Sequence, residues 1–349
     1  MNLSVFKRVI SKGVYRPEID GLRFIAIISV ILFHIDGFLS LYMGKTSILS
    51  EIWFTGHFGV PLFFSISGFV LTSQLLKSKK FSYKQYLIRR VERIEPPFLI
   101  TTLLFYFLLS FRDGFDAEKN YSLFRVLTYT SNFDTNLINV VTWSLEIEVV
   151  FYLLLPILYW LAKDEIWKWL FLAVATFVFS EFYEIQFLTN FFHWFVVGIV
   201  LAILETRKNP VLLFKLIGKV LALVSLLVFF GLAYYEEMLA VKIIQPLLLF
   251  VFLYSVLIQG YFVKWLSIEL FTIIGGACYI IYLIHFQVIS VSGHIMIAFI
   301  ENRELLAIIL LVTTPLICLL AFPILERPFM KRNWWKLEGA KRIIKSKWS

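Results

Sequence analysis

Apolar runs separated by short polar segments recur along the whole chain. We expect ten of them to cross a bilayer as helices, because each is near the ~20 residues that a span requires. They are residues 22–41, 57–76, 95–111, 142–162, 167–183, 188–204, 219–235, 243–260, 270–292 and 305–325. The pattern predicts an all-α, polytopic integral membrane protein. Pro96 and Pro97 mark the expected start of the third span, as prolines of a first helical turn do.

One stretch fits neither a span nor a plain loop. Residues 121–141 are too polar to cross a membrane and too apolar to be simply solvated. They indicate either an interfacial helix or a re-entrant segment.

The composition excludes a soluble globular protein. Hydrophobic residues make up 60% of the chain and charged residues only 16%, whereas about a quarter of a soluble domain is charged. We expect a cytoplasmic N-terminal segment at 1–21, one ten-helix membrane domain at 22–325 and a basic cytoplasmic tail at 326–349.

The basic residues behind the net charge of +9 indicate how the chain is oriented in the membrane. Lysines and arginines lie in short segments between apolar runs, and they do not form the solvated basic face that nucleic-acid binders present. With the N-terminus in the cytoplasm, 27 of the 33 basic residues fall in cytoplasmic segments and 6 outside. This asymmetry predicts that both termini are cytoplasmic, and no nucleic-acid partner is expected.

Ionisable groups within spans cost free energy, so they are candidates for function. Arg23 and His34 stand eleven residues apart in the first expected span, and Asp20 precedes Arg23 by one turn. Eleven residues at 100° each bring two side chains to one helix face, about 16 Å apart. The alternative for His34 is a hydrogen-bonded core histidine.

Arg90 and Arg93 lie at the expected cytoplasmic mouth of the third span. Their spacing of three places them on one helix face. Two guanidinium groups there could hold an anionic phosphate through bidentate contacts. The alternative is ordinary positive charge on the cytoplasmic side.

The segment TWSLEIEVVFYLLLP at 142–156 carries carboxylates into an apolar run. Ser144, Glu148 and Tyr152 are four residues apart in turn and share one face. Glu148 could orient an imidazole or take a proton. Glu146 points to the opposite face, and we expect it to reach the lipid headgroups, which is also the alternative for Glu148.

Tyr282 and His285 share a helix face in the ninth expected span. They could line a site, or His285 could be a core residue. The five histidines lie in separate segments, so no metal site is expected.

Together these segments resemble the acyltransferase-3 family, whose members are membrane enzymes that O-acetylate bacterial cell-surface polysaccharides. Six segments carry the resemblance in the family's order: RPEIDGLR with the Arg23-to-His34 spacing, GVPLFFSISGF, RRVER before the double proline, TWSLEIEVVFYLLLP, YIIYLIHFQVI and ILERPF. The chain departs from many members at Pro61 and Val149. Larger relatives carry a fused C-terminal SGNH-type domain, which we do not expect here.

The resemblance implies a ten-helix fold that takes an acyl group, usually acetyl, from cytoplasmic acyl-CoA as co-substrate, with no permanently bound cofactor. It makes Arg23, His34 and the pair Arg90 and Arg93 the essential basic residues, and Glu148 the catalytic carboxylate. The motif positions that it matches are Asp20, Ser67, Gly68, Phe69, Glu326, Arg327 and Pro328.

The expected protein is therefore an acyl-CoA-dependent O-acyltransferase of a bacterial cell (inner) membrane. Arg23, Arg90 and Arg93 would hold the phosphates of acyl-CoA, and His34 would act as general base or carry the acyl group. The side chains expected to line the acceptor site or pore are Ser67, Trp143, Ser144, Tyr282 and His285. Expected partners are a carbohydrate acceptor, acyl-CoA and membrane lipid. A proton-coupled transporter or flippase of a glycan or small metabolite is the alternative, and the oligomeric state stays open.

Overall fold

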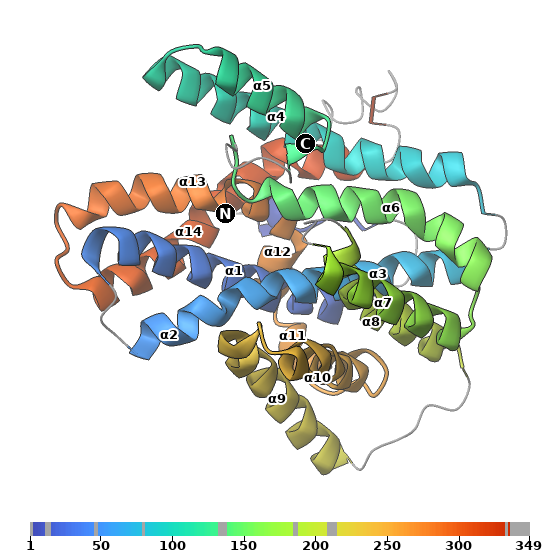
Figure 1. Cartoon of the computed structure of the whole chain (residues 1–349). Helices are drawn as coiled ribbons and strands as arrows, with labels where there is room; N and C mark the ends of the chain where they lie inside the picture. Colours follow the sequence, from blue (N-terminus) through green and yellow to red (C-terminus); the bar gives the residue numbers. More distant parts are fainter. Residues whose placement is uncertain are drawn as a thin grey trace. The chain divides into compact units, whose positions relative to one another are not determined.

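The computed structural model describes residues 3–10, 15–44, 48–78, 81–131, 138–183, 188–207, 215–331 and 334–335. Every regular element in this part of the chain is a helix (Figure 1). The chain divides into two compact units that alternate along the sequence. Unit 1 comprises Met1–Tyr15, Ser82–Tyr152 and Gly276–Ser349, and unit 2 comprises Arg16–Phe81 and Leu153–Gly275.

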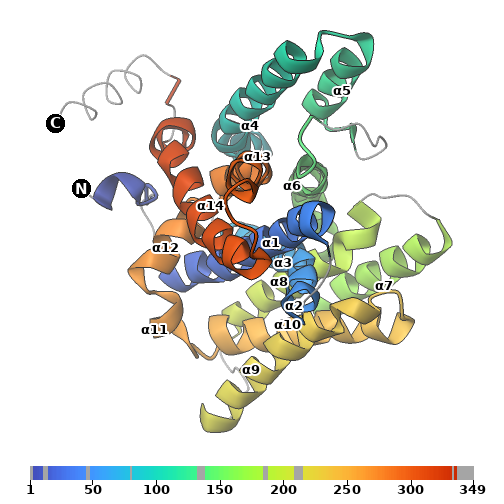
Figure 2. The same cartoon turned by 90° about the vertical axis from the view of Figure 1, so that its left-hand side faces the viewer.

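Unit 1 is built mainly from helices of the middle and the end of the chain. Its elements are η1 (Leu3–Phe6), α4 (Tyr83–Asp113), α5 (Ala117–Leu127), the first half of α6 (Thr142–Ala162), α13 (Cys278–Ile297), α14 (Arg303–Leu325) and η5 (Arg327–Met330). Helices α13 and α14 run side by side in both views (Figures 1 and 2).

Unit 2 contains the first span and the central helices. Its elements are α1 (Pro17–Met43), α2 (Ile48–Phe54), η2 (Thr55–Phe58), α3 (Gly59–Leu76), the rest of α6, α7 (Ile166–Phe182), α8 (Leu188–Thr206), α9 (Lys215–Gly231), η4 (Leu232–Tyr235), α10 (Leu239–Leu257), α11 (Val263–Leu266) and α12 (Glu269–Gly276). Helix α3 packs extensively against α8.

The helices confirm the all-α membrane fold. In the described residues nine helices are long and apolar enough to cross a membrane. They account for nine of the ten expected spans. The remaining expected span, 167–183, is α7, whose 17 residues reach the lower end of the roughly 17–25 that a span needs.

The start expected for the third span is wrong. Helix α4 begins at Tyr83, and Pro96 and Pro97 lie inside it. A proline removes the N–H that would bond the carbonyl four residues earlier, so Pro96 deprives the Glu92 carbonyl of its helical donor. The indole Nε1 of Trp334 donates to that carbonyl oxygen at 2.9 Å. The helix therefore continues through the double proline with a donor from the far end of the chain.

The ninth expected span, 270–292, is also not one helix. It divides into α12 and α13 at Ala277, whose φ of −98° and ψ of 10° are not helical. Gly275 lies against the backbone of Asp20 so closely that an added Cβ would clash with the Asp20 carbonyl. Tyr282 and His285 therefore lie in the first two turns of α13, close to this break.

Glycines allow α3 and α8 to approach each other. A Cβ at Gly68 would collide with the carbonyl of Phe195, and a Cβ at Gly198 would collide with the carbonyl of Ser65. The Ser65 hydroxyl also donates to the Trp194 carbonyl at 2.8 Å. Small residues and hydroxyls of this kind hold membrane helices together, because lipid provides no hydrophobic drive for helix pairing. The SGF segment is therefore a packing element of unit 2.

The stretch 121–141 is partly helical. Helix α5 ends at Leu127 and packs against α4, and its 11 residues are too few to span a bilayer. Tyr129 follows it, and its hydroxyl donates to Glu95 Oε1 at 2.7 Å. Burial and then the Glu95 carboxylate raise the pKa of Tyr129 above its ordinary value, which keeps this donor protonated. Residues 132–137 lie outside the described residues.

Candidate active site

Arg23 and His34 stand on one uninterrupted helix, α1. This continuity preserves the common face and the separation of about 16 Å that the spacing predicts. The Arg23 Nη1 lies 2.9 Å from Asp20 Oδ1, and the Asp20 side chain is completely buried. Because a buried carboxylate needs a paired cation, Asp20 fixes the Arg23 side chain on the helix.

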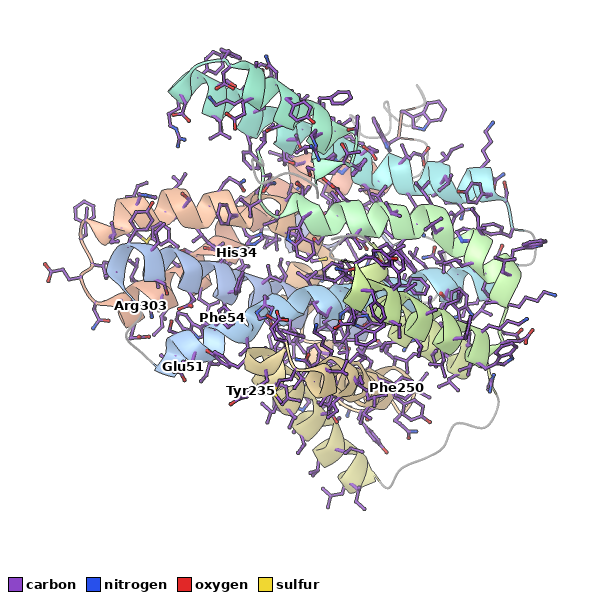
Figure 3. The ribbon with its side chains drawn as sticks, in the orientation of Figure 1. His34, Glu51, Phe54, Tyr235, Phe250 and Arg303 are labelled. Carbon is purple, nitrogen blue, oxygen red and sulfur yellow. The ribbon has the colours of Figure 1, made fainter. Side chains whose placement is uncertain are left out.

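His34 is half-buried and lies beside a pair of packed aromatic rings. The Phe33 ring is 5.1 Å from the His34 ring, edge-on, and 5.9 Å from the ring of Phe54 on α2. Figure 3 labels His34 on α1 together with Phe54. Nearby, Ser50 Oγ donates to the buried Asp36 Oδ1 at 2.5 Å, which ties α2 to the same part of α1.

A polar cluster forms in unit 1 between α4, α6 and α13. On α6, Glu148 and Tyr152 are four residues apart in one continuous helix, so these two side chains share the face that the sequence predicts. The Arg90 guanidinium lies 5.4 Å from the Tyr86 ring centroid and 6.0 Å from that of Tyr152. Arg90 thus lies beside Tyr152, which is one helical turn from Glu148 on α6.

The α6 face continues to α13 through hydroxyl groups. Ser144 Oγ lies 2.5 Å from the Tyr282 hydroxyl, and the Tyr282 ring centroid is 5.6 Å from that of His285. We call Arg90, Ser144, Glu148, Tyr152, Tyr282 and His285 the unit 1 cluster. It joins residues from three expected motif segments that are far apart in the sequence.

His285 is fully buried, and a contact with the backbone determines which of its ring nitrogens carries the proton. Its Nδ1 lies 2.7 Å from the Tyr282 carbonyl oxygen. A carbonyl can only accept, so Nδ1 carries the proton of a neutral ring and Nε2 is its acceptor nitrogen. The acceptor nitrogen of the neutral His285 ring is therefore Nε2.

The other expected site residues are half-buried or buried. Trp143 on α6 and Ser67 on α3 are half-buried. Arg93 is also half-buried, one turn along α4 from Arg90. Phe69 is buried, and the guanidinium of Arg16 lies 5.3 Å from its ring centroid.

The closing ERP segment is structural in unit 1. Glu326 is fully buried, and its Oε2 accepts the Ile280 N–H at 3.0 Å. Arg327 Nε donates to the Lys7 carbonyl at 3.1 Å, and Pro328 belongs to η5. This segment therefore connects the end of α14 to the start of α13 and to the N-terminal segment.

The expectation that Glu146 reaches lipid headgroups is wrong. Its side chain is buried, and Oε1 accepts the Ser131 N–H at 3.2 Å as well as the Ser131 hydroxyl. The carboxylate satisfies donors of the segment that precedes α6, a requirement that only the tertiary structure reveals.

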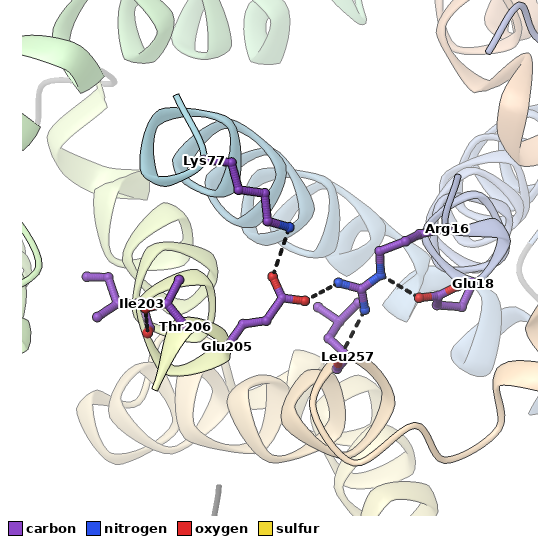
Figure 4. A network of polar contacts seen from close by, with 7 residues as sticks. All are labelled: Arg16, Glu18, Lys77, Ile203, Glu205, Thr206 and Leu257. Carbon is purple, nitrogen blue, oxygen red and sulfur yellow. Dashed lines mark hydrogen bonds and ion pairs between the residues drawn. The ribbon is translucent and has the colours of Figure 1, made fainter. Parts of the chain in front are cut away.

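Arg16 is a structural residue that the sequence did not single out. Figure 4 shows its guanidinium bonded to Glu18, Glu205 and the Leu257 carbonyl, with Lys77 joining at Glu205. The network connects the ends of α1, α3, α8 and α10 in unit 2. In the sequence, Arg16 opens the RPEIDGLR segment, but its charge is counted only toward membrane orientation.

The fold and these side chains define a polytopic helical membrane protein that keeps ionisable groups within its spans. Residues 16–325 match the family model described as an acyltransferase domain. The match covers most of the chain, so the protein belongs to the acyltransferase-3 family, as its motifs predict.

Several known proteins are similar to the chain. OatA, an O-acetyltransferase of Staphylococcus aureus strain NCTC 8325, is 26% identical over 92% of this chain and 58% of its own length. An S. aureus MSSA476 protein provisionally named an O-acetyltransferase is 31% identical over 41% of this chain and 24% of its own length. An uncharacterised Haemophilus influenzae protein is 30% identical over 49% of this chain and 85% of its own.

The chain thus spans about a quarter of the provisionally named staphylococcal relative and 58% of OatA. No solved structure matches it.

Proposed function

We propose that the protein is an O-acyltransferase of a bacterial cell inner membrane, which moves an acetyl group from cytoplasmic acyl-CoA to a carbohydrate hydroxyl. Family membership supports acyl transfer. The names of the relatives support an oxygen acceptor.

The observation that carries the proposal is the arrangement on α1. A guanidinium held by a buried carboxylate and an imidazole share one face of an unbroken helix. Acyl-CoA has phosphates at one end and a thioester at the other, joined by a long thin arm. A cation and a base about 16 Å apart suit the two ends of that molecule.

In the direct route, His34 takes the proton of the acceptor hydroxyl as its oxygen attacks the thioester carbonyl. The carbon–sulfur bond breaks, and the proton passes to the departing thiolate, which releases coenzyme A and the ester. In the alternative route, the imidazole nitrogen attacks the thioester carbonyl, the carbon–sulfur bond breaks and coenzyme A leaves as the thiol with the imidazole proton. The acceptor hydroxyl then displaces the acyl group from the nitrogen, and its proton returns to the imidazole. Only the second route predicts ping-pong kinetics.

In this proposal unit 1 contributes ligand-binding groups of its own. Arg90 and Arg93 bind phosphate oxygens as planar donors. Glu148 and the Ser144–Tyr282 hydroxyl pair offer hydrogen bonds to the hydroxyls of a carbohydrate acceptor. Each sugar hydroxyl both donates and accepts hydrogen bonds, so a carbohydrate site needs acceptors as well as donors.

The test is transfer of label from acetyl-CoA to glycan by the purified protein in proteoliposomes. His34→Ala should abolish transfer while the protein still inserts and folds. The matched control is His294→Ala, because His294 is exposed and its Nδ1 lies 2.6 Å from the Ser290 carbonyl. Near-normal transfer by His34→Ala would refute its catalytic role.

A second experiment concerns the phosphate site. Arg93→Lys keeps the charge and removes the planar fork, so it should weaken acyl-CoA binding about tenfold, as loss of one charge-assisted hydrogen bond of about 1.5 kcal/mol would do. Unchanged acyl-CoA affinity would remove Arg93 from the phosphate site. Solute transport without acyl-CoA, and no acyl transfer, would instead support the transporter alternative.

A further inference from the structure

A cavity of about 430 Å³ lies between the ends of α3 and α6, and all of its lining residues belong to unit 2. Two of the candidate spans end beside it, at Leu76 and Ala162. Most of the lining is apolar or aromatic and comes from Leu75, Phe81, Pro156, Tyr159 and Trp160. The volume falls within the roughly 300–1,000 Å³ of ligand pockets, so the cavity can hold a substantial apolar group.

The cavity borders on an apolar part of the surface. Trp160, which lines it, is exposed, and so are its neighbours Ile157 and Leu161 on α6. Exposed apolar side chains on a membrane span face lipid, because the lipid tails are as apolar as they are. A molecule that reaches the cavity along this surface is therefore an amphiphile of the bilayer.

The charged part of the lining is formed by Lys163 and Asp164, directly after α6. Lys163 has a left-handed backbone, with a φ of 50°, and its N–H donates to the Tyr159 carbonyl at 2.7 Å. Its own carbonyl accepts the indole N–H of the fully buried Trp169 at 2.9 Å. Helix α7 therefore holds the turn that places the two charges at the cavity.

The neighbouring charges of this turn satisfy each other. Glu165 accepts hydrogen bonds from Lys168 Nζ at 2.7 Å and from Trp167 Nε1 at 3.0 Å. Within the described residues, no ion pair or side-chain hydrogen bond engages Lys163 or Asp164. A cation and an anion that adjoin in the chain thus remain available to a ligand.

We propose that this cavity is a binding site for phosphatidylethanolamine, a lipid whose headgroup carries one phosphate and one primary ammonium. The Lys163 ammonium pairs with the phosphate, and the Asp164 carboxylate accepts hydrogen bonds from the lipid ammonium. The apolar and aromatic lining receives the first part of an acyl chain. The site uses none of the residues of the candidate active site.

Other headgroups match the two charges less well. Phosphatidylcholine has a quaternary ammonium with no N–H to donate. Phosphatidylglycerol is anionic and offers no cation to Asp164. The choice among the three lipids therefore depends on Asp164, whereas Lys163 serves the phosphate that all three share.

The experiment titrates the full chain in detergent with these three phospholipids, each with the same acyl chains, and measures bound lipid by native mass spectrometry. Phosphatidylethanolamine should bind about tenfold more tightly than the other two, the factor that one charge-assisted hydrogen bond supplies. Asp164→Asn should remove this preference. Lys163→Gln should weaken the binding of all three lipids.

Two control variants separate the site from general effects of the membrane interface. Lys264 is exposed on α11 in unit 2 and does not line the cavity, so Lys264→Gln removes the same charge and should change no affinity. Trp160→Ala should weaken lipid binding, whereas Trp167→Ala removes another exposed indole outside the cavity and should not. General anchoring by interfacial tryptophans would make the two alanine variants behave alike.

The lipid site is refuted if the three phospholipids bind equally, or if phosphatidylcholine binds best, because the aromatic rings would then select the cation. It is also refuted if Asp164→Asn keeps the preference, or if Lys264→Gln weakens binding as much as Lys163→Gln does. Either failure would leave the proposed acyl transfer untouched, since that reaction is measured separately.

Discussion

Replacing Gly68 with alanine tests the close packing of α3 on α8. The added Cβ would lie 3.1 Å from the Phe195 carbonyl carbon and closer still to its oxygen, which is nearer than van der Waals contact allows. Both groups belong to the backbone, so no flexible side chain can move aside. The two helices must separate instead.

The size of the effect follows from that separation. Carbon–oxygen contacts at close helix interfaces are about 3.3–3.6 Å, so the helices must part by roughly 1 Å at this point. Overpacking of this kind costs about 1–3 kcal/mol. Alanine favours helix over glycine by about 0.5–1 kcal/mol, so we expect a net loss of roughly 0.5–2 kcal/mol of stability.

The assay is unfolding of the purified protein in detergent, with a matched glycine as control. Gly37 lies within α1, and a Cβ added there would meet no atom within 4 Å. Gly37→Ala should therefore keep or slightly raise the midpoint of unfolding, whereas Gly68→Ala should lower it. Both substitutions change one residue type in a helix, so only the packing differs.

The reasoning fails if Gly68→Ala unfolds at the wild-type midpoint. It also fails if Gly37→Ala is destabilised as much, because the loss would then come from the substitution rather than from the α3–α8 contact. Gly198→Ala should resemble Gly68→Ala, since its Cβ would meet the Ser65 carbonyl across the same interface.

Two further predictions follow from single contacts, and a third follows from the charge asymmetry of the chain. Arg16→Lys should destabilise the protein by about 1.5–3 kcal/mol, because lysine cannot donate to two carboxylates and a carbonyl in the geometry of a guanidinium. A double-mutant cycle with Glu205→Gln should give non-additive free energies of unfolding. Additive values would contradict the contact. Tyr282→Phe removes the hydroxyl bonded to α6 and should cost about 0.5–1.5 kcal/mol and reduce kcat; an unchanged kcat would limit Tyr282 to a structural role. Cysteines at Glu118 and Lys163 should react with an impermeant reagent from opposite sides of the membrane, and labelling from one side would contradict the predicted orientation.

The sequence determined the local features of this protein. Long apolar runs specify helices that cross a membrane, because backbone groups in lipid must bond within their own segment. Helical periodicity alone placed Arg23 and His34 on one face, and likewise Glu148 and Tyr152. These relations hold in any continuous helix, whatever its neighbours are.

Only the tertiary structure decided contacts between distant segments. Ser144 meets Tyr282 across 138 residues, and Trp334 completes α4 by donating to a carbonyl freed 242 residues earlier. The residue type of Pro96 predicts the start of a helix. Pro96 instead lies inside α4, because Trp334 supplies the donor that the proline removes. Hydrogen bonds of this kind depend on which helix faces are packed together, and helical periodicity fixes a face without fixing its neighbour.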